Sequence, residues 1–159
     1  RVALPRTLQD CFAYLVAPDD NLAGDKQQAA LTELARLVES KPFDLIDMTS
    51  TLVRVLLHLE DKFGSSMFAD KKWECLLAFG IYAPLDTCVQ LVEEMKGGIS
   101  LGTRVEALSI IAASAERLSA SPNLGQSPHT KNITAASAGT MSTRLKIALG
   151  LHEDSNRNK

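Results

Sequence analysis

The sequence predicts an all-α protein, an irregular HEAT-like α-solenoid fragment over residues 1–118 followed by a flexible C-terminal tail. Apolar residues recur three and four positions apart in six successive segments, which is the spacing of one helix face. No segment keeps the alternation of a half-buried strand, and no Asn-Gly or Asp-Gly hairpin signal occurs. Helix starts near residues 25, 66 and 100 give a period of about 40, close to that of HEAT and armadillo repeats. A compact irregular bundle is the structural alternative.

The first two helices are predicted from capping signals. Thr7 can cap a first helix, with Asp10 three residues later as in a capping box, and this helix ends before Pro18. Asp25 and Gln28 resemble a second capping box and predict a second helix that ends before the next proline. In both segments the apolar residues keep one face.

The third helix has the clearest pattern. Its apolar stripe runs over 45–63, with Gly64 as the stop, and extra apolar positions beside the stripe indicate burial on more than one side. On the opposite face, Arg54, His58 and Asp61 form a polar stripe at positions i, i+4 and i+7.

Three further helices are expected before residue 119. The fourth opens at Ser65 or Ser66, and its uncharged second half, 75–83, predicts burial on all sides. Pro84 starts the fifth helix and Ser100 caps the sixth. The faces expected to point inward are Leu85, Cys88, Val89, Val92 and Met95 in the fifth helix, and Leu101, Val105, Leu108, Ala112 and Ala115 in the sixth.

Residues 119–159 differ in composition from the rest. They hold ten Ser or Thr and none of the eight aromatic residues, so they have little apolar surface to offset the entropy of ordering them. We predict a flexible linker with one short helix over 141–151, where apolar residues return at helical spacing. Ser121 and Ser127 precede prolines and are candidate phosphorylation sites.

Composition disfavours several function classes. Residues 1–118 carry 12 Lys or Arg against 17 Asp or Glu, which is unfavourable for binding nucleic-acid phosphates. No apolar run is long enough for a membrane span. The three cysteines and three histidines are scattered without zinc-ligand spacing, which predicts reduced, intracellular thiols and no metal site.

No catalytic constellation is present in the sequence. The segment 97–103 has the G-x-x-x-x-G spacing of half a phosphate-binding loop, but Thr103 stands where the lysine belongs and no strand precedes it. A helix end followed by a turn explains it better. We therefore expect no enzyme activity and no cofactor, and predict a helical module that binds other proteins.

One stretch carries a resemblance to a known family. The string Leu4-Pro5-Arg6-Thr7-Leu8-Gln9-Asp10-Cys11, which continues to Leu15 and the acidic pair at 19–20, resembles the conserved-domain opening of the telomere length regulation protein family. The likeness continues through the amphipathic segment 29–38 and through 55–62, whose Leu-Leu-His-Leu-Glu is similar to a family segment.

The resemblance implies a fold and a role. Family members are longer α-solenoids, so this chain, which begins with Arg1, is expected to be an internal fragment. They are scaffold subunits of a co-chaperone complex with two Tti partners, which works indirectly with Hsp-ninety and a RuvB-like adaptor. Their clients are the phosphatidylinositol-3-kinase-related kinases of DNA-damage checkpoints, and their location is cytoplasmic and nuclear, including telomeres. Direct telomeric DNA binding is the alternative function, against which the acidic body argues.

A scaffold of this kind binds through exposed polar residues on helix faces. The candidate partner-binding residues are Arg6, Gln9 and Asp10 on the first helix, together with the stripe of Arg54, His58 and Asp61 on the third. The alternative is that both sets are merely solvated, or that Arg6 and Asp10 pair with each other.

Overall fold

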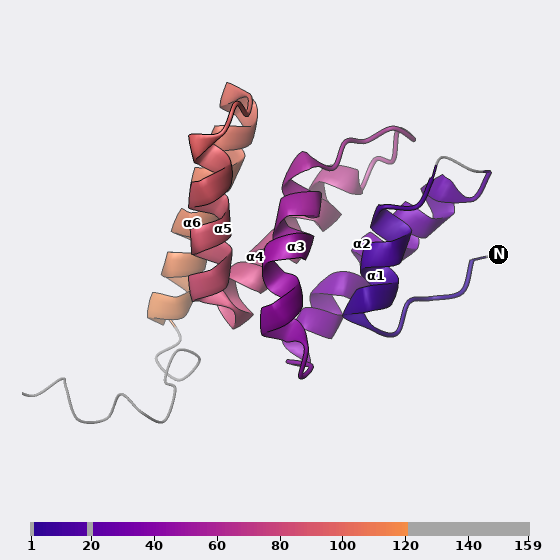
Figure 1. The fold of residues 1–159 in the computed structure, drawn as a ribbon, viewed down its shortest axis with the longest axis horizontal. Coiled ribbons are helices and arrows are strands. Elements are labelled where there is room, and N and C mark those ends of the chain that lie inside the picture. The colour runs from indigo at the N-terminus through magenta and orange to yellow at the C-terminus, as the bar shows by residue number, and fades with distance from the viewer. Residues whose placement is uncertain (1, 19–20, 121–159) are drawn as a thin grey trace, which may run out of the picture. The chain divides into compact units, whose positions relative to one another are not determined.

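The structure, a computed structural model, describes residues 2–18 and 21–120, and these form helices without any strand. The all-α prediction is therefore confirmed over this part of the chain (Figure 1). In chain order the helices are α1 (Leu8–Leu15), α2 (Ala23–Glu39), α3 (Leu45–His58), α4 (Phe68–Tyr82), α5 (Pro84–Lys96) and α6 (Leu101–Ala120).

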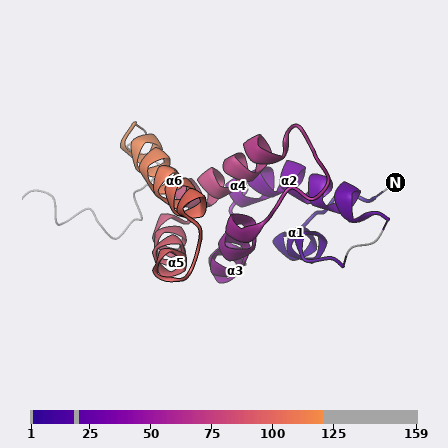
Figure 2. The same ribbon diagram turned by 90° about the horizontal axis from the view of Figure 1, so that it is seen from above.

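The helices form three stacked hairpins in two layers. Within each hairpin, α1 packs on α2, α3 on α4 and α5 on α6. Between hairpins, α1, α3 and α5 contact one another in sequence, and α2, α4 and α6 do the same, so the helices lie in two rows in Figure 2. This arrangement is that of an α-solenoid, in which each repeat packs on its neighbours.

The core lies between the two layers. Its largest fully buried side chains include Leu34 of α2, Leu52 and Leu56 of α3, and Leu76 and Phe79 of α4. Burial of each such side chain contributes about 1.5–3 kcal/mol. The helix α3 also buries residues beside the line of Leu52 and Leu56. It is therefore covered on more than one side, as the sequence predicted.

The first predicted cap is confirmed and the second is wrong. Thr7 Oγ1 accepts the Asp10 N–H at 3.0 Å, and Asp10 Oδ2 accepts the Thr7 N–H at 3.0 Å, which completes a capping box. In contrast, α2 begins at Ala23 without a side-chain cap, so Asp25 lies inside its first turn. There the carboxylate still faces the positive end of the helix dipole.

The third helix is shorter than predicted. It ends at His58, because Leu59 has extended backbone, and the chain then forms a loop up to α4. Asp61 Oδ1 accepts the N–H groups of Phe63 and Ser65, each at 3.2 Å, and such side-chain bonds compete with helical ones. Gly64, the predicted stop, has φ +66° within this loop. The fourth helix, α4, starts at Phe68, after the serines predicted to open it.

Two small residues set the distance between α4 and α6. A Cβ atom built on Gly80 would lie 1.9 Å from Ser114 Oγ, so α6 approaches the α4 backbone closely at this point. Gly80 is buried in α4, as are most residues of the uncharged segment 75–83. Pro84 is the first residue of α5, as predicted.

The predicted orientation of the last two helices is wrong. In α5 the fully buried residues are Thr87 and Leu91, while Cys88 and Met95 are half-buried and the other three predicted residues are exposed. In α6 the buried residues are Ala107, Ile110 and Ser114. All five residues predicted to face inward in α6 are exposed. Periodicity located apolar stripes on α5 and α6, but packing on α3 and α4 uses another side of each helix, which includes Leu91 and Ile110.

Several predictions lie outside the described residues. These are the flexible linker from residue 121 onward, the helix over 141–151, and the phosphorylation candidates Ser121 and Ser127. Within 2–18 and 21–120, no helix combines the length and apolarity needed to cross a membrane.

Candidate functional site

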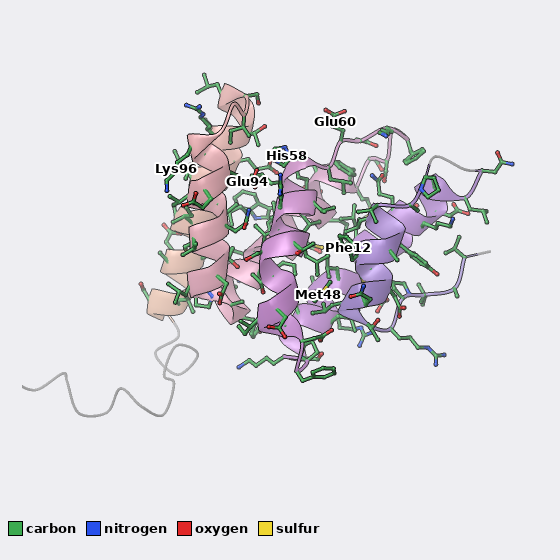
Figure 3. All side chains as sticks on the ribbon, in the orientation of Figure 1. Phe12, Met48, His58, Glu60, Glu94 and Lys96 are labelled. Atoms are coloured by element: carbon green, nitrogen blue, oxygen red, sulfur yellow. The ribbon has the colours of Figure 1, made fainter. Side chains whose placement is uncertain are left out.

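The polar residues of α3 meet α5 at one carboxylate. His58 Nε2 lies 2.7 Å from Glu94 Oε2, and Arg54 Nε lies 3.4 Å from Glu94 Oε1. Gln90 Nε2 donates to the same Oε1 at 2.8 Å. The side chains of His58 and Glu94 lie between the two helices in Figure 3. Glu94 is thus the centre of a polar cluster that joins the second hairpin to the third.

This cluster combines a shielded acceptor with exposed donors. The Glu94 side chain is 14% exposed, whereas those of His58 and Arg54 are 47% and 69% exposed. Glu94 therefore holds both groups in place while they remain open to solvent. A guanidinium has five N–H donors, so Arg54 can bind a further acceptor while it contacts Glu94.

Asp61 does not belong to this cluster. It was predicted on the same helical stripe as Arg54 and His58, but α3 ends before it. Its carboxylate instead binds backbone N–H groups within the following loop. The structure therefore brings together two of the three predicted residues and adds Glu94 and Gln90, which are not among the candidate residues predicted from the sequence.

The partner-binding residues predicted on the first helix lie apart from the cluster at the α3–α5 contact. Arg6 and Asp10 border a shallow cavity of about 680 Å³ between α1 and α2, which also includes Glu33 and Arg36. Gln9 is exposed on α1. The structure therefore does not join Arg6, Gln9 and Asp10 to the Arg54–His58 cluster at the α3–α5 contact.

Asp10 is occupied by the capping interaction. Its carboxylate accepts the backbone N–H of Arg6 at 3.0 Å as well as that of Thr7. These hydrogen bonds, first the one from Arg6, lower the pKa of Asp10 below its ordinary value of 3.8. The pairing expected between Arg6 and Asp10 thus runs through the Arg6 backbone.

A second junction between the hairpins was missed in the sequence. Lys72 is buried in α4, and its Nζ donates to Glu106 Oε2 of α6 at 3.1 Å and to the main-chain oxygen of Leu57 at 3.2 Å. The one available signal was a lysine three residues before the uncharged half of a helix. Its two acceptors lie 15 and 34 residues away, which helical spacing does not predict.

The cysteines of the core are unsuited to nucleophilic chemistry. Burial raises the pKa of Cys11 and of Cys75 to about 12, so both are thiols at neutral pH. No group of three metal-ligating side chains occurs within residues 2–18 and 21–120.

The glycine-containing segment 97–103 forms a helix end and a turn. The Gly97 N–H donates to Glu94 O as α5 ends. Ser100 Oγ then accepts the Thr103 N–H at 3.1 Å and caps α6, as predicted.

Comparisons with known proteins agree on one family. The model of a family described as "Telomere length regulation protein" matches residues 5–115. The "Telomere length regulation protein TEL2 homolog" of Homo sapiens is 29% identical over 125 residues, which cover 78% of this chain and 15% of the relative. The Xenopus tropicalis protein of the same name is 23% identical over 140 residues, covering 87% of this chain and 15% of that relative.

The chain thus spans about 15% of the length of these relatives. The search of the solved structures gave no match. Because the family model covers more than two thirds of the 159 residues, the chain belongs to the telomere length regulation protein family.

Proposed function

We propose that this stack of hairpins is a protein-interaction scaffold within a co-chaperone. In this proposal a longer protein that contains the stack works with two Tti subunits and, indirectly, with Hsp-ninety and its RuvB-like adaptor. It matures phosphatidylinositol-3-kinase-related kinases in the cytoplasm and nucleus, and thereby affects checkpoint signalling and telomere length. Family membership and the solenoid arrangement support the scaffold part of the proposal.

The observation that carries the proposal is the Arg54–His58–Glu94 cluster. It lies on the α1–α3–α5 layer and combines residues of two hairpins, so its geometry depends on how the repeats stack. A planar guanidinium fixed by a shielded carboxylate can bind a carboxylate of a partner in a defined orientation. The cluster therefore suits an acidic segment of a Tti subunit or of a client kinase.

Charge reversal tests this proposal. We would introduce Arg6→Glu and Arg54→Glu, singly and together, into the full-length protein and measure recovery of Tti subunits and of a client kinase. Because the two arginines lie at separate contacts, the single variants show which contact is used. Arg117→Glu is the matched control, since Arg117 is exposed and borders a cavity with residues of α2 and α4 in the other layer.

Arg54→Glu is expected to reduce recovery at least about tenfold while circular dichroism stays native, since fully formed charged contacts at interfaces contribute more than about 1.4 kcal/mol. Because a new glutamate would repel Glu94, Arg54→Ala serves as a second variant with the same expected direction. Unchanged recovery in all variants with an intact fold would refute a role for these arginines.

Salt dependence separates the scaffold from a direct telomeric DNA-binding module. The affinity of a DNA-binding protein falls steeply with salt, by about one log-log unit for each phosphate contact. Titration of telomeric duplex with this chain from 50 to 200 mM salt is expected to show no such slope. A slope of several units would favour the DNA-binding function instead.

A further inference from the structure

A cavity of about 390 Å³ lies between the first half of α2 and the segment that joins α3 to α4. Leu31 of α2 lines it as a buried side chain, and Phe63, Met67 and Phe68 line it from the other segment. Phe68 packs on the core, but the side chains of Phe63 and Met67 are 47% and 53% exposed. The volume is typical of binding pockets, and the apolar lining residues suit a large apolar side chain of a ligand.

Hydrogen bonds and close packing hold the walls of this cavity in place. Gln27, buried in α2, donates from Nε2 to Glu60 O at 3.3 Å and so ties the loop to the helix. A Cβ atom built on Gly24 would lie 3.2 Å from Phe63 Cγ, so the aromatic ring lies directly on the α2 backbone. A ligand therefore finds the apolar walls already formed, which lowers the entropic cost of binding.

The charged residues at the rim of the cavity indicate what it binds. They are Asp25 of α2 and Lys71 of α4. Lys71 Nζ pairs with Glu74 Oε2 at 2.7 Å, so these two charges offset each other. The Asp25 carboxylate is exposed and has no hydrogen bond or ion pair with any residue in the described part of the chain. Its free oxygens favour a cationic group of a ligand at the rim.

We infer that this cavity binds a short segment of a partner protein in which a large apolar side chain lies beside a lysine or arginine. The apolar side chain would contact Phe63 and Met67, and the cationic group would pair with Asp25. In such sites a buried apolar anchor contributes most of the affinity, and the charged contact contributes selectivity. None of the lining residues belongs to the polar cluster at the α3–α5 contact, so this site is independent of the one in the proposed function.

Peptide binding to the full-length protein tests the chemistry of the ligand. The probes are fluorescein-labelled hexapeptides with Leu, Met, Phe or Ser at the centre, flanked by Lys, by Glu or by Ser. In fluorescence anisotropy, a Lys-flanked apolar peptide is expected to bind with a dissociation constant below about 0.1 mM, at least about tenfold tighter than its Glu-flanked counterpart. A central Ser should abolish this binding. Equal affinity for Lys-flanked and Glu-flanked peptides, or no binding by any peptide, would overturn the inference.

Matched charge variants locate the cationic group. Asp25→Lys should weaken binding of the Lys-flanked peptide at least about tenfold and strengthen that of the Glu-flanked peptide. Asp70→Lys is the control, because Asp70 is also an exposed acidic residue in the first turn of a helix but does not line the cavity. It should change the affinity by less than about twofold. An equal loss in both variants would show that net charge alone attracts the peptide, which contradicts a contact with Asp25.

A second pair of variants tests the apolar contact. Met67→Ser should weaken binding at least about fivefold, because it removes apolar surface that the peptide buries. Val16→Ser should leave the affinity unchanged, since Val16 is 49% exposed, much like Met67, but lies outside the cavity. Both side chains are half-exposed, so the circular dichroism of both variants should stay native. An affinity that Met67→Ser leaves unchanged would refute the apolar contact.

Photo-crosslinking shows where the peptide lies on the full-length protein. Benzoylphenylalanine replaces the central residue of the Lys-flanked peptide, and the crosslinked residues are identified by mass spectrometry. We expect crosslinks to residues 63–68 that an excess of unlabelled peptide removes. Crosslinks confined to other parts of the protein would overturn the inference.

Discussion

Lys72 and Glu106 form an ion pair of 3.1 Å across the α4–α6 contact, and the ammonium group also binds the last turn of α3 through Leu57 O. The Lys72 side chain is 10% exposed. A buried ammonium is costly unless its protons find acceptors, and here it finds them in two other helices. One side chain thereby fixes the second hairpin against the third, which His58 and Glu94 also join.

Removal of the Lys72 ammonium should destabilise the fold strongly. We expect Lys72→Ala to lower the free energy of unfolding by about 2–4 kcal/mol, because it leaves the Glu106 carboxylate and a helix-end carbonyl without their donor. Lys71→Ala is the matched control, since Lys71 pairs with Glu74 on the surface. Its removal should lower the free energy of unfolding by under about 1 kcal/mol. Urea unfolding measures both, and equal losses would contradict the role of Lys72.

Gly80→Ala should disturb the α4–α6 contact. The new methyl group would meet Ser114, and overpacking of this kind costs about 1–3 kcal/mol, partly offset by the higher helix propensity of alanine. Gly102→Ala on α6 is the control, because its nearest neighbour would be a side-chain oxygen at an ordinary 3.7 Å. We expect Ser114→Gly to restore part of the stability lost in Gly80→Ala, as measured by thermal unfolding. If it restores nothing, the clash is not the cause.

The capping box should make stability depend on pH in the acid range. The pKa of Asp10 is lowered in the folded protein, so its contribution is fully present above its ordinary value of 3.8. This contribution is lost as the pH falls from 3.8 through the lower pKa that Asp10 has in the folded protein. The melting temperature of Asp10→Asn should therefore lie below that of the wild type at pH 6, and the two should converge at lower pH. A difference that stays constant down to pH 2 would show that the charge is not responsible.

The central stripe of α3 should carry much of the stability. Leu52→Ala or Leu56→Ala is expected to lower the free energy of unfolding by about 2–5 kcal/mol through lost burial and a residual cavity. His58→Ala removes the half-exposed interaction with Glu94 and should lower the free energy of unfolding by under about 1 kcal/mol. Chemical denaturation of the three variants compares them directly. A His58→Ala loss as large as that of Leu56→Ala would mean that the polar cluster contributes to the core.

The candidate site was partly predictable. Arg54 and His58 were recognised because they share one face of a regular helix, and this depends on local spacing. Their partner Glu94 was not, since it lies 36 residues from His58 and on another hairpin. Asp61 was misplaced because its side chain bonds to the backbone of its own loop and competes with the helix.

The sequence by itself determined the number and order of the described helices, the cap at Thr7 and the start of α5 at Pro84. These features depend on interactions within a few residues, so the local pattern contains the necessary information. Only the tertiary structure decided which side of α5 and α6 is buried. Each helix has apolar residues on two sides, and the choice between them depends on close packing, above all of Ser114 on Gly80.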